Sequence, residues 1–311
     1  MAEAAQKKFD VYQHVTDTIL AEIEKGCVPW RKPWSGARTG LALPKRVTGD
    51  NYRGINVLML WLTAATKGYA SPTWMTYRQA QELGGQVRKG ERSATVVKFG
   101  SVEKDVQDSV TDDSDAVKRL YARAYSVFNV DQIDGLAEEW HMRPEAPRDL
   151  GTKTDPVLEA WFGSMGVPIE QSDEPAAYYA PSEDRIHMPQ IGTFESTQAF
   201  FATLAHEMAH ATMHPKRLDR QHEGKNREER YAKEEVVGEL AASMVSARLG
   251  IRPAFDQSAA YLDHWIKVMR EDSRAIVRAA SMAQAAADWM FDTAGEPGAV
   301  VDRAEDIREA A

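Results

Sequence analysis

The chain has one cysteine, Cys27, in 311 residues, and no apolar run long enough to cross a bilayer. A single thiol cannot form an internal disulfide, and it excludes a zinc site built from several thiolates. The first residues, MAEAAQKKF, are polar and lack the apolar core of a secretion signal. We therefore expect a cytoplasmic protein with no membrane partner. Because 43% of the residues are hydrophobic, the chain can bury sizeable cores, and its length favours two domains.

The most informative motif is the pentapeptide HEMAH, which runs from His206 to His210. Residues four apart lie on one face of a helix, so His206 and His210 can share a metal ion while Glu207 reaches a water molecule bound to it. The alternative is a surface helix with two unrelated histidines. Apolar residues surround the motif from Phe200 to Met213, which favours a buried metallopeptidase helix. We expect Thr197 to cap its start.

A catalytic zinc ion needs a third protein ligand and an open position for water. The segment from Tyr231 to Met244 predicts a second helix, with a buried apolar stripe and two glutamates one turn apart beside it. We assign Glu235 as the ligand and Glu239 as the carboxylate that orients a ligating imidazole. Glu234 is the rival ligand, and all three glutamates could instead be solvated.

These assignments define a mechanism of amide hydrolysis. Zinc held by two histidines and a glutamate would lower the pKa of its water, and Glu207 would take that proton and pass it to the leaving amine. Manganese or another divalent metal can occupy the same ligands. The candidates for stabilising the transition state are Tyr231, His222 and His187, for which surface or core placement is the alternative. Residues 178–189 predict a hairpin whose edge can pair with an extended substrate backbone.

Charge is unevenly distributed along the chain. The net charge is -9, but residues 1–100 carry 15 basic and 8 acidic side chains, residues 101–140 carry 4 and 10, and the remainder carries 19 and 29. The first third is therefore basic and the rest acidic. This asymmetry indicates a module that binds a polyanion, joined to a domain of a different kind.

The basic residues of the first third are concentrated between residues 25 and 53, where aromatic side chains alternate with them. Prolines and glycines in this stretch exclude a regular helix, so we expect a surface loop. Rings that stack on bases, among cations that contact phosphates, suit single-stranded nucleic acid. The alternatives are tryptophans that fill a core and a basic loop that only aids solubility. The candidate residues are Trp30, Arg31, Lys32, Trp34, Arg38, Lys45, Arg46, Tyr52 and Arg53.

Periodicity gives a coarse α+β organisation. Helices are predicted over residues 9–25, 54–66 and 74–83, strands over 93–99 and 120–130, an acidic loop over 103–115, and long helices over 256–291. The predicted division is a single-stranded DNA-binding domain at 1–140, a linker at 141–156, a metallopeptidase domain at 157–291 and a flexible acidic tail at 292–311.

Several stretches resemble the ArdC antirestriction proteins of conjugative plasmids, which share their N-terminal domain with TraC-type plasmid primases. In the first domain the matching residues are EKGCVPWRKPW at 24–34, YRGIN at 52–56, GG at 84–85, VRKG at 87–90 and VFNVDQIDGL at 127–136. In the second domain they are DRIHMP at 184–189, HEMAH at 206–210 and YAKEEVVGE at 231–239.

The resemblance implies a single-stranded DNA-binding domain followed by a zincin-like metallopeptidase domain, in a protein that protects incoming DNA from host restriction during conjugation. It leaves two hypotheses. In the first, DNA binding carries antirestriction and the metal site is structural or secondary. In the second, an active metallopeptidase cleaves a host or plasmid protein and uses DNA binding to localise itself. Priming, as in the TraC relatives, is not supported, because no acidic cluster for nucleotidyl transfer stands out.

Overall fold

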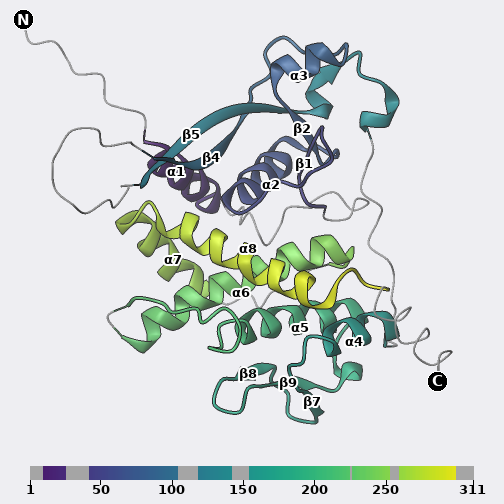
Figure 1. The fold of residues 1–311 in the computed structure, drawn as a ribbon, viewed down its shortest axis with the longest axis vertical. Helices are drawn as coiled ribbons and strands as arrows, with labels where there is room; N and C mark the ends of the chain where they lie inside the picture. Colours follow the sequence, from purple (N-terminus) through teal and green to yellow (C-terminus); the bar gives the residue numbers. More distant parts are fainter. Residues whose placement is uncertain are drawn as a thin grey trace, which may run out of the picture.

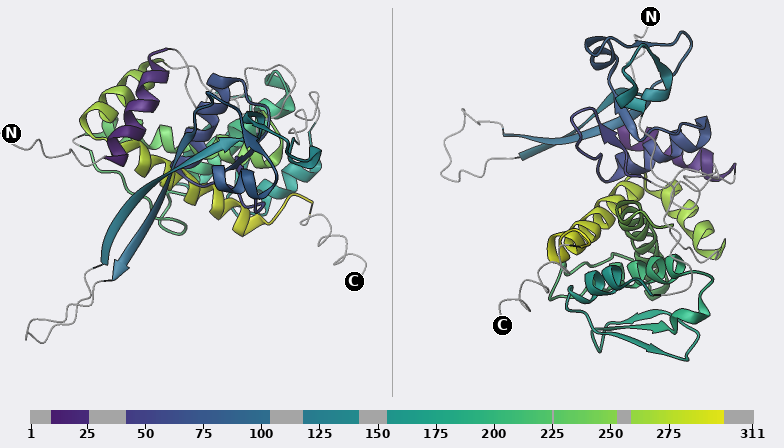
Figure 2. Two further views of the ribbon diagram at one scale, coloured as in Figure 1. Left: turned by 90° about the horizontal axis from the view of Figure 1, so that it is seen from above. Right: turned by 90° about the vertical axis from the view of Figure 1, so that its right-hand side faces the viewer.

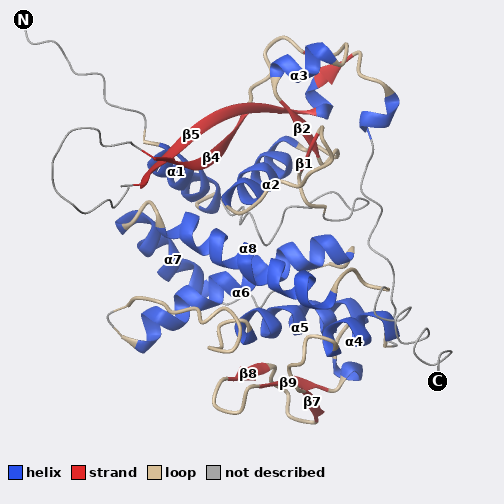
Figure 3. Ribbon diagram, in the orientation of Figure 1, coloured by secondary structure: helices blue, strands red, loops and turns tan. Residues whose placement is uncertain are grey.

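The protein is described from a computed structural model, which covers residues 10–25, 42–103, 118–141, 154–224, 226–252 and 259–298 (Figure 1). It has two domains. The N-terminal domain combines helices with a twisted sheet, and the C-terminal domain is a group of helices with a small sheet at its far side (Figure 3). The predicted α+β class and the two-domain organisation are confirmed.

The N-terminal domain is built around a four-stranded sheet of order β1-β2-β5-β4. Its helices are α1 (Val11–Ile23), α2 (Ile55–Lys67) and α3 (Tyr77–Glu82), and its strands are β1 (Lys45–Arg46), β2 (Thr73–Met75), β3 (Gln86–Val87), β4 (Ala94–Glu103), β5 (Lys118–Asn129) and β6 (Ile133–Asp134). The long strands β4 and β5 are antiparallel, with Val96 opposite Tyr125 and Lys98 opposite Arg123. They extend away from the body of the molecule as a two-stranded ribbon (Figure 2).

The predicted helix over residues 74–83 is wrong in its first part. Trp74 and Met75 are buried in strand β2, where they pair with β5. The helix begins only after Thr76, whose side chain accepts a hydrogen bond from the backbone N–H of Gln79, while the Gln79 side chain accepts one from Thr76 N–H. This capping box fixes the helix start at Tyr77, three residues later than the apolar pattern indicated.

The C-terminal domain holds the HEMAH helix. Its helices are α4 (Pro156–Gly163), α5 (Thr197–Ala211), α6 (Arg227–Leu249), α7 (Ala259–Glu271) and α8 (Ala275–Ala294), and its strands are β7 (Ile169–Ser172), β8 (Tyr178–Ala180) and β9 (Arg185–Pro189). The predicted hairpin is present as β8 and β9, with β8 at the edge of the sheet. The cap of α5 is Ser196, because its hydroxyl accepts from Ala199 N–H at 3.1 Å; the predicted cap, Thr197, lies inside the first turn.

One hydrophobic core runs through both domains. Helix α1 packs against α7, and α2 packs against α8. Polar contacts reinforce this interface, since Gly54 N–H donates to Gln284 Oε1 at 3.0 Å and the Thr16 hydroxyl donates to the Ser273 carbonyl at 2.7 Å. The domains are therefore separate along the chain but share buried surface, so tests of either one need the full chain. Among the described helices, none has the length and apolar character needed to span a membrane.

Candidate metal centre

The three predicted ligands lie together where α5 packs against α6. The Nε2 atoms of His206 and His210 are 3.0 Å apart. Glu235 faces both imidazoles, with Oε2 3.5 Å from His206 Nε2 and Oε1 3.4 Å from His210 Nε2. One turn of α5 separates the histidines, and α6 brings the glutamate to them across the helix interface.

The geometry of these donors fits a metal ion. Tetrahedral zinc, with bonds of about 2.0–2.1 Å, places its ligand atoms about 3.3 Å apart. The observed separations bracket that value. In the described part of the chain, these three residues are the one group of histidine, cysteine and acidic side chains close enough to hold a metal ion together.

Gly238 makes room for the two imidazoles. It lies on α6, three residues after Glu235, and a Cβ atom there would stand 2.8 Å from His210 Cε1 and 3.0 Å from His206 Cε1. Glycine in a helix interior costs about 1 kcal/mol relative to alanine. Sequence reasoning missed this residue, although a glycine inside an otherwise strong helix pattern is a signal of close approach.

We expect Gly238→Ala to weaken metal binding by tenfold or more, because the added methyl group displaces both imidazoles from the position at which their Nε2 atoms can bind one metal ion. Isothermal titration of the full chain with a divalent metal measures this. The matched control is Gly163→Ala at the end of α4, where a Cβ meets no atom within 4 Å. Equal metal affinity in the Gly238→Ala and Gly163→Ala variants would contradict the assigned site.

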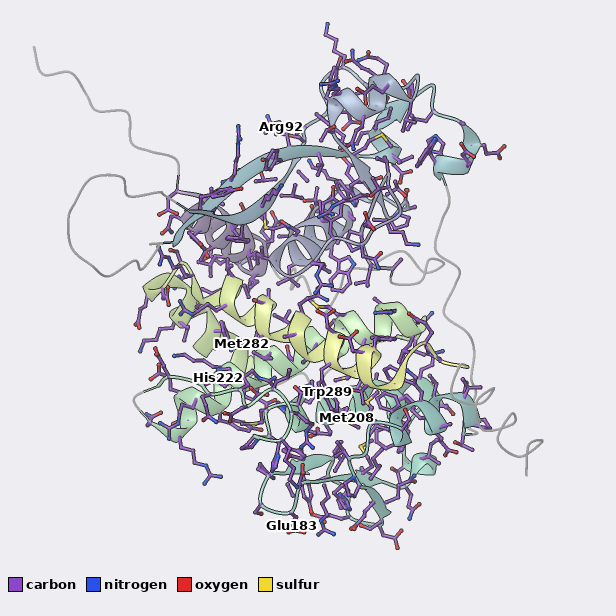
Figure 4. The ribbon with its side chains drawn as sticks, viewed as in Figure 1. Arg92, Glu183, Met208, His222, Met282 and Trp289 are labelled. Carbon is purple, nitrogen blue, oxygen red and sulfur yellow. The ribbon has the colours of Figure 1, made fainter. Side chains whose placement is uncertain are left out.

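Glu234 hydrogen-bonds to the ring nitrogen of His210 that faces away from the other two ligands. Its Oε1 atom accepts from His210 Nδ1 at 3.1 Å, which leaves Nε2 of that ring facing the centre. Glu234 also binds Arg220, with Nε to Oε2 at 2.9 Å, and His222, with Nε2 to Oε2 at 2.5 Å. Arg220 in turn donates to the Thr212 hydroxyl and to the Ala209 carbonyl, each at 2.9 Å. This buried network joins α5, α6 and the segment between them, where Figure 4 labels His222.

The same contacts set the protonation behaviour of the metal-free site. Burial alone lowers the pKa of His210, but the hydrogen bonds to Glu234 and Glu235 outweigh it and raise that pKa to about 10. Burial raises the pKa of Glu235, and hydrogen bonds from His206 and His210 reverse the effect, so its pKa is lowered well below the ordinary value. The Glu235 carboxylate is therefore charged at neutral pH, and His210 would have to release a proton to act as a metal ligand.

The other predicted residues of this domain have different surroundings. Glu207 is 7% exposed and lies on α5 beside the ligands, whereas Tyr231 is 51% exposed at the start of α6. The His187 ring is hydrogen-bonded to the Ser172 hydroxyl of β7 and to the Ala176 carbonyl of the segment between β7 and β8, each at 2.7 Å. Glu239 is buried on α6, and its orienting role stays a prediction. The carboxylate that does hydrogen-bond to a predicted ligand is Glu234, at Nδ1 of His210. The sequence offers Glu234 as the alternative to Glu235 for the metal ligand.

The predicted nucleic-acid residues divide into two groups. Trp30, Arg31, Lys32, Trp34 and Arg38 lie outside the described residues. Of the others, Lys45 and Arg46 are exposed on β1. The ring of Tyr52 is only 6% exposed and has the Arg46 guanidinium 5.1 Å from its centroid, so stacking on a base does not fit its burial. Arg53 forms an ion pair with Asp288 of α8 and joins the two domains.

The fold and the site together define a zincin-like metallopeptidase domain that follows an α+β domain. Comparison with known proteins agrees: residues 156–282 match the family model of a zincin-like metallopeptidase, and residues 9–128 match that of the N-terminal domain of anti-restriction factor ArdC.

Solved structures match almost the whole chain. The metal-free crystal structure of the antirestriction ArdC protein from the R388 plasmid has a TM-score of 0.81 and 51% identity, over 92% of this chain and 98% of that chain. The Mn(II)-bound crystal structure of the same protein has a TM-score of 0.79 and 50% identity, over 93% of this chain and 99% of that chain. The chain belongs to the ArdC family of antirestriction proteins.

Curated relatives extend this picture. An uncharacterized protein of Sinorhizobium fredii is 39% identical over 92% of both chains. A DNA primase TraC of Escherichia coli is 35% identical over 92% of this chain, but the match spans 27% of the primase. The resemblance drawn from the sequence motifs is thus confirmed, and relation to a primase suggests nucleic-acid binding.

Proposed function

We propose that this protein binds single-stranded DNA in the cytoplasm and protects incoming plasmid DNA from host restriction during conjugation. The observation that carries the proposal is the likeness to the ArdC protein of the R388 plasmid, which extends through both domains. The basic character of the first hundred residues supports contact with a polyanion.

We further propose that His206, His210 and Glu235 hold a divalent metal ion, with Glu207 beside it as a general base. A metal bound there supplies Lewis-acid polarisation and makes a coordinated water molecule easier to deprotonate. The donor set of two histidines and one glutamate favours zinc, and the Mn(II)-bound structure of the relative supports manganese as well. Elemental analysis of the protein purified without added metal identifies the ion.

A mating experiment tests the antirestriction role. A conjugative plasmid that carries this coding sequence should enter a restricting recipient more often than the same plasmid with the sequence deleted. The two plasmids should enter a non-restricting recipient equally well, because protection matters only where the DNA is cut. An equal deficit in both recipients would instead indicate a general defect of transfer.

The second candidate function is cleavage of a host or plasmid protein by an active metallopeptidase. The observation that favours it is the edge strand β8, which packs beside α5 and can pair with an extended peptide. Both functions belong to the same chain, so a variant that lacks only the general base, Glu207, distinguishes them. Antirestriction that survives without Glu207 supports DNA binding as the mechanism, and its loss supports cleavage.

A further inference from the structure

The outer face of the β4–β5 ribbon presents aromatic rings and cations together. Side chains alternate between the two faces of a strand, so Lys98 on β4 shares one face with Tyr121, Arg123 and Tyr125 on β5. Both tyrosines are 40% exposed. The Arg123 guanidinium lies 5.6 Å from the centroid of the Tyr125 ring. We call these four residues the ribbon face.

The opposite face of the same ribbon lies toward the rest of the domain, although Phe99 on that face is still 44% exposed. Val97 is buried, Phe99 packs against Tyr12 of α1 with ring centroids 5.9 Å apart, and Thr95 Oγ1 is 3.3 Å from His14 Nε2. Helices α1 and α2 lie on this side of the strands (Figure 1). The ribbon face therefore looks away from the body of the protein, and Figure 4 labels the exposed Arg92 on the same outer side.

The two cations of the ribbon face repel each other and so destabilise the ribbon. Lys98 and Arg123 are direct cross-strand partners, and like charges at that spacing destabilise a pair of strands. Within the described residues, no carboxylate neutralises either of them. A polyanion laid along the face would remove this repulsion.

The tyrosines are placed to receive bases. Tyr121 lies over Gly100, where a Cβ atom would stand 2.5 Å from the ring, so the glycine lets the ring lie close to the strand. Tyr125 is four positions after Tyr121 along the strand, a distance of about 13 Å. This length spans several nucleotides of one strand, with Arg123 between the rings. Duplex DNA would have to unstack a base step to receive such a ring, which costs a few kcal/mol, whereas the bases of a single strand are already free to stack on it.

We propose that the ribbon face is a binding site for single-stranded nucleic acid, in which Tyr121 and Tyr125 stack on bases and Lys98 and Arg123 contact phosphates. The proposal rests on the proposed DNA-binding function and gives it a site outside the basic stretch of sequence at residues 25–53.

The test is titration of the full chain with a labelled oligothymidylate, followed by fluorescence anisotropy. The double variant Tyr121→Ala/Tyr125→Ala should bind at least about 20-fold more weakly, since each stacked ring contributes about fivefold or more. Phe99→Ala, an exposed aromatic on the other face of β4, is the matched control and should bind within about twofold of the wild type. Gly100→Ala keeps both rings but displaces Tyr121, and it should weaken binding as well.

The charges are tested by salt dependence. Lys98→Gln/Arg123→Gln should reduce the slope of log affinity against log salt by about 1.4, because each phosphate contact on a single strand contributes about 0.7. If the tyrosine and charge variants bind as the wild type does, while Trp30→Ala/Trp34→Ala abolishes binding, the ribbon-face proposal is overturned and the DNA-binding function stands. If the wild type itself does not bind the oligonucleotide, the proposed function fails.

Discussion

Glu207→Gln is expected to retain metal binding and to lower any metal-dependent peptide hydrolysis by about 10²–10⁴-fold, the usual contribution of a general base. The glutamine has the same size, so it fits the 7% exposed position on α5 without disturbing the packing of that helix. It cannot take a proton from water. His206, His210 and Glu235 remain in place, so metal affinity should change little. Hydrolysis of a fluorogenic peptide library, with metal titration in parallel, measures both quantities.

The control is Glu271→Gln, an exposed glutamate at the end of α7. It should leave metal binding, hydrolysis and antirestriction unchanged. Loss of metal binding in Glu207→Gln would show that Glu207 is a ligand or a structural residue and not a base. Mating assays with the same variant then decide whether hydrolysis takes part in antirestriction.

Glu234→Gln should lower the free energy of unfolding by about 3–5 kcal/mol, because it leaves a buried arginine without its charged partner. The side chains of Glu234 and Arg220 are 7% and 5% exposed, and the carboxylate also binds His210 and His222. Metal affinity should fall about 10–100-fold, since the carboxylate that orients His210 is lost. Denaturant unfolding in the presence of a chelator isolates the stability effect, and metal titration measures the second.

An exposed ion pair on another helix supplies the comparison. Glu82→Gln removes the partner of Arg78 on α3, where the two side chains are 56% and 87% exposed, and should cost less than about 1 kcal/mol. A similar, small cost for Glu234→Gln would mean that Arg220 finds water or another acceptor. Unchanged metal affinity in Glu234→Gln would show that His210 is oriented without this carboxylate.

Local spacing explains why much of the C-terminal domain was predictable. The four-residue separation of His206 and His210 is a property of any helix, and the apolar residues around them identify the buried face. The assignment of Glu235 required one further assumption, that the next helix packs against the first, and α6 does so. The prediction that a helix begins at Trp74 was wrong because a short apolar run fits a buried strand as well as a helix. Only the pairing of Trp74 and Met75 with β5 decides between the two.

The sequence by itself determined the HEMAH helix, its glutamate partner, the two-domain order and the family. Tertiary structure alone decided three other points: that Glu234 lies behind His210, that Gly238 makes room for both imidazoles, and that Tyr121, Arg123 and Tyr125 share an outward face with Lys98. Each depends on the rotation of a helix or on the register between strands. Packing of the whole chain fixes these quantities, and no local pattern of residues contains them.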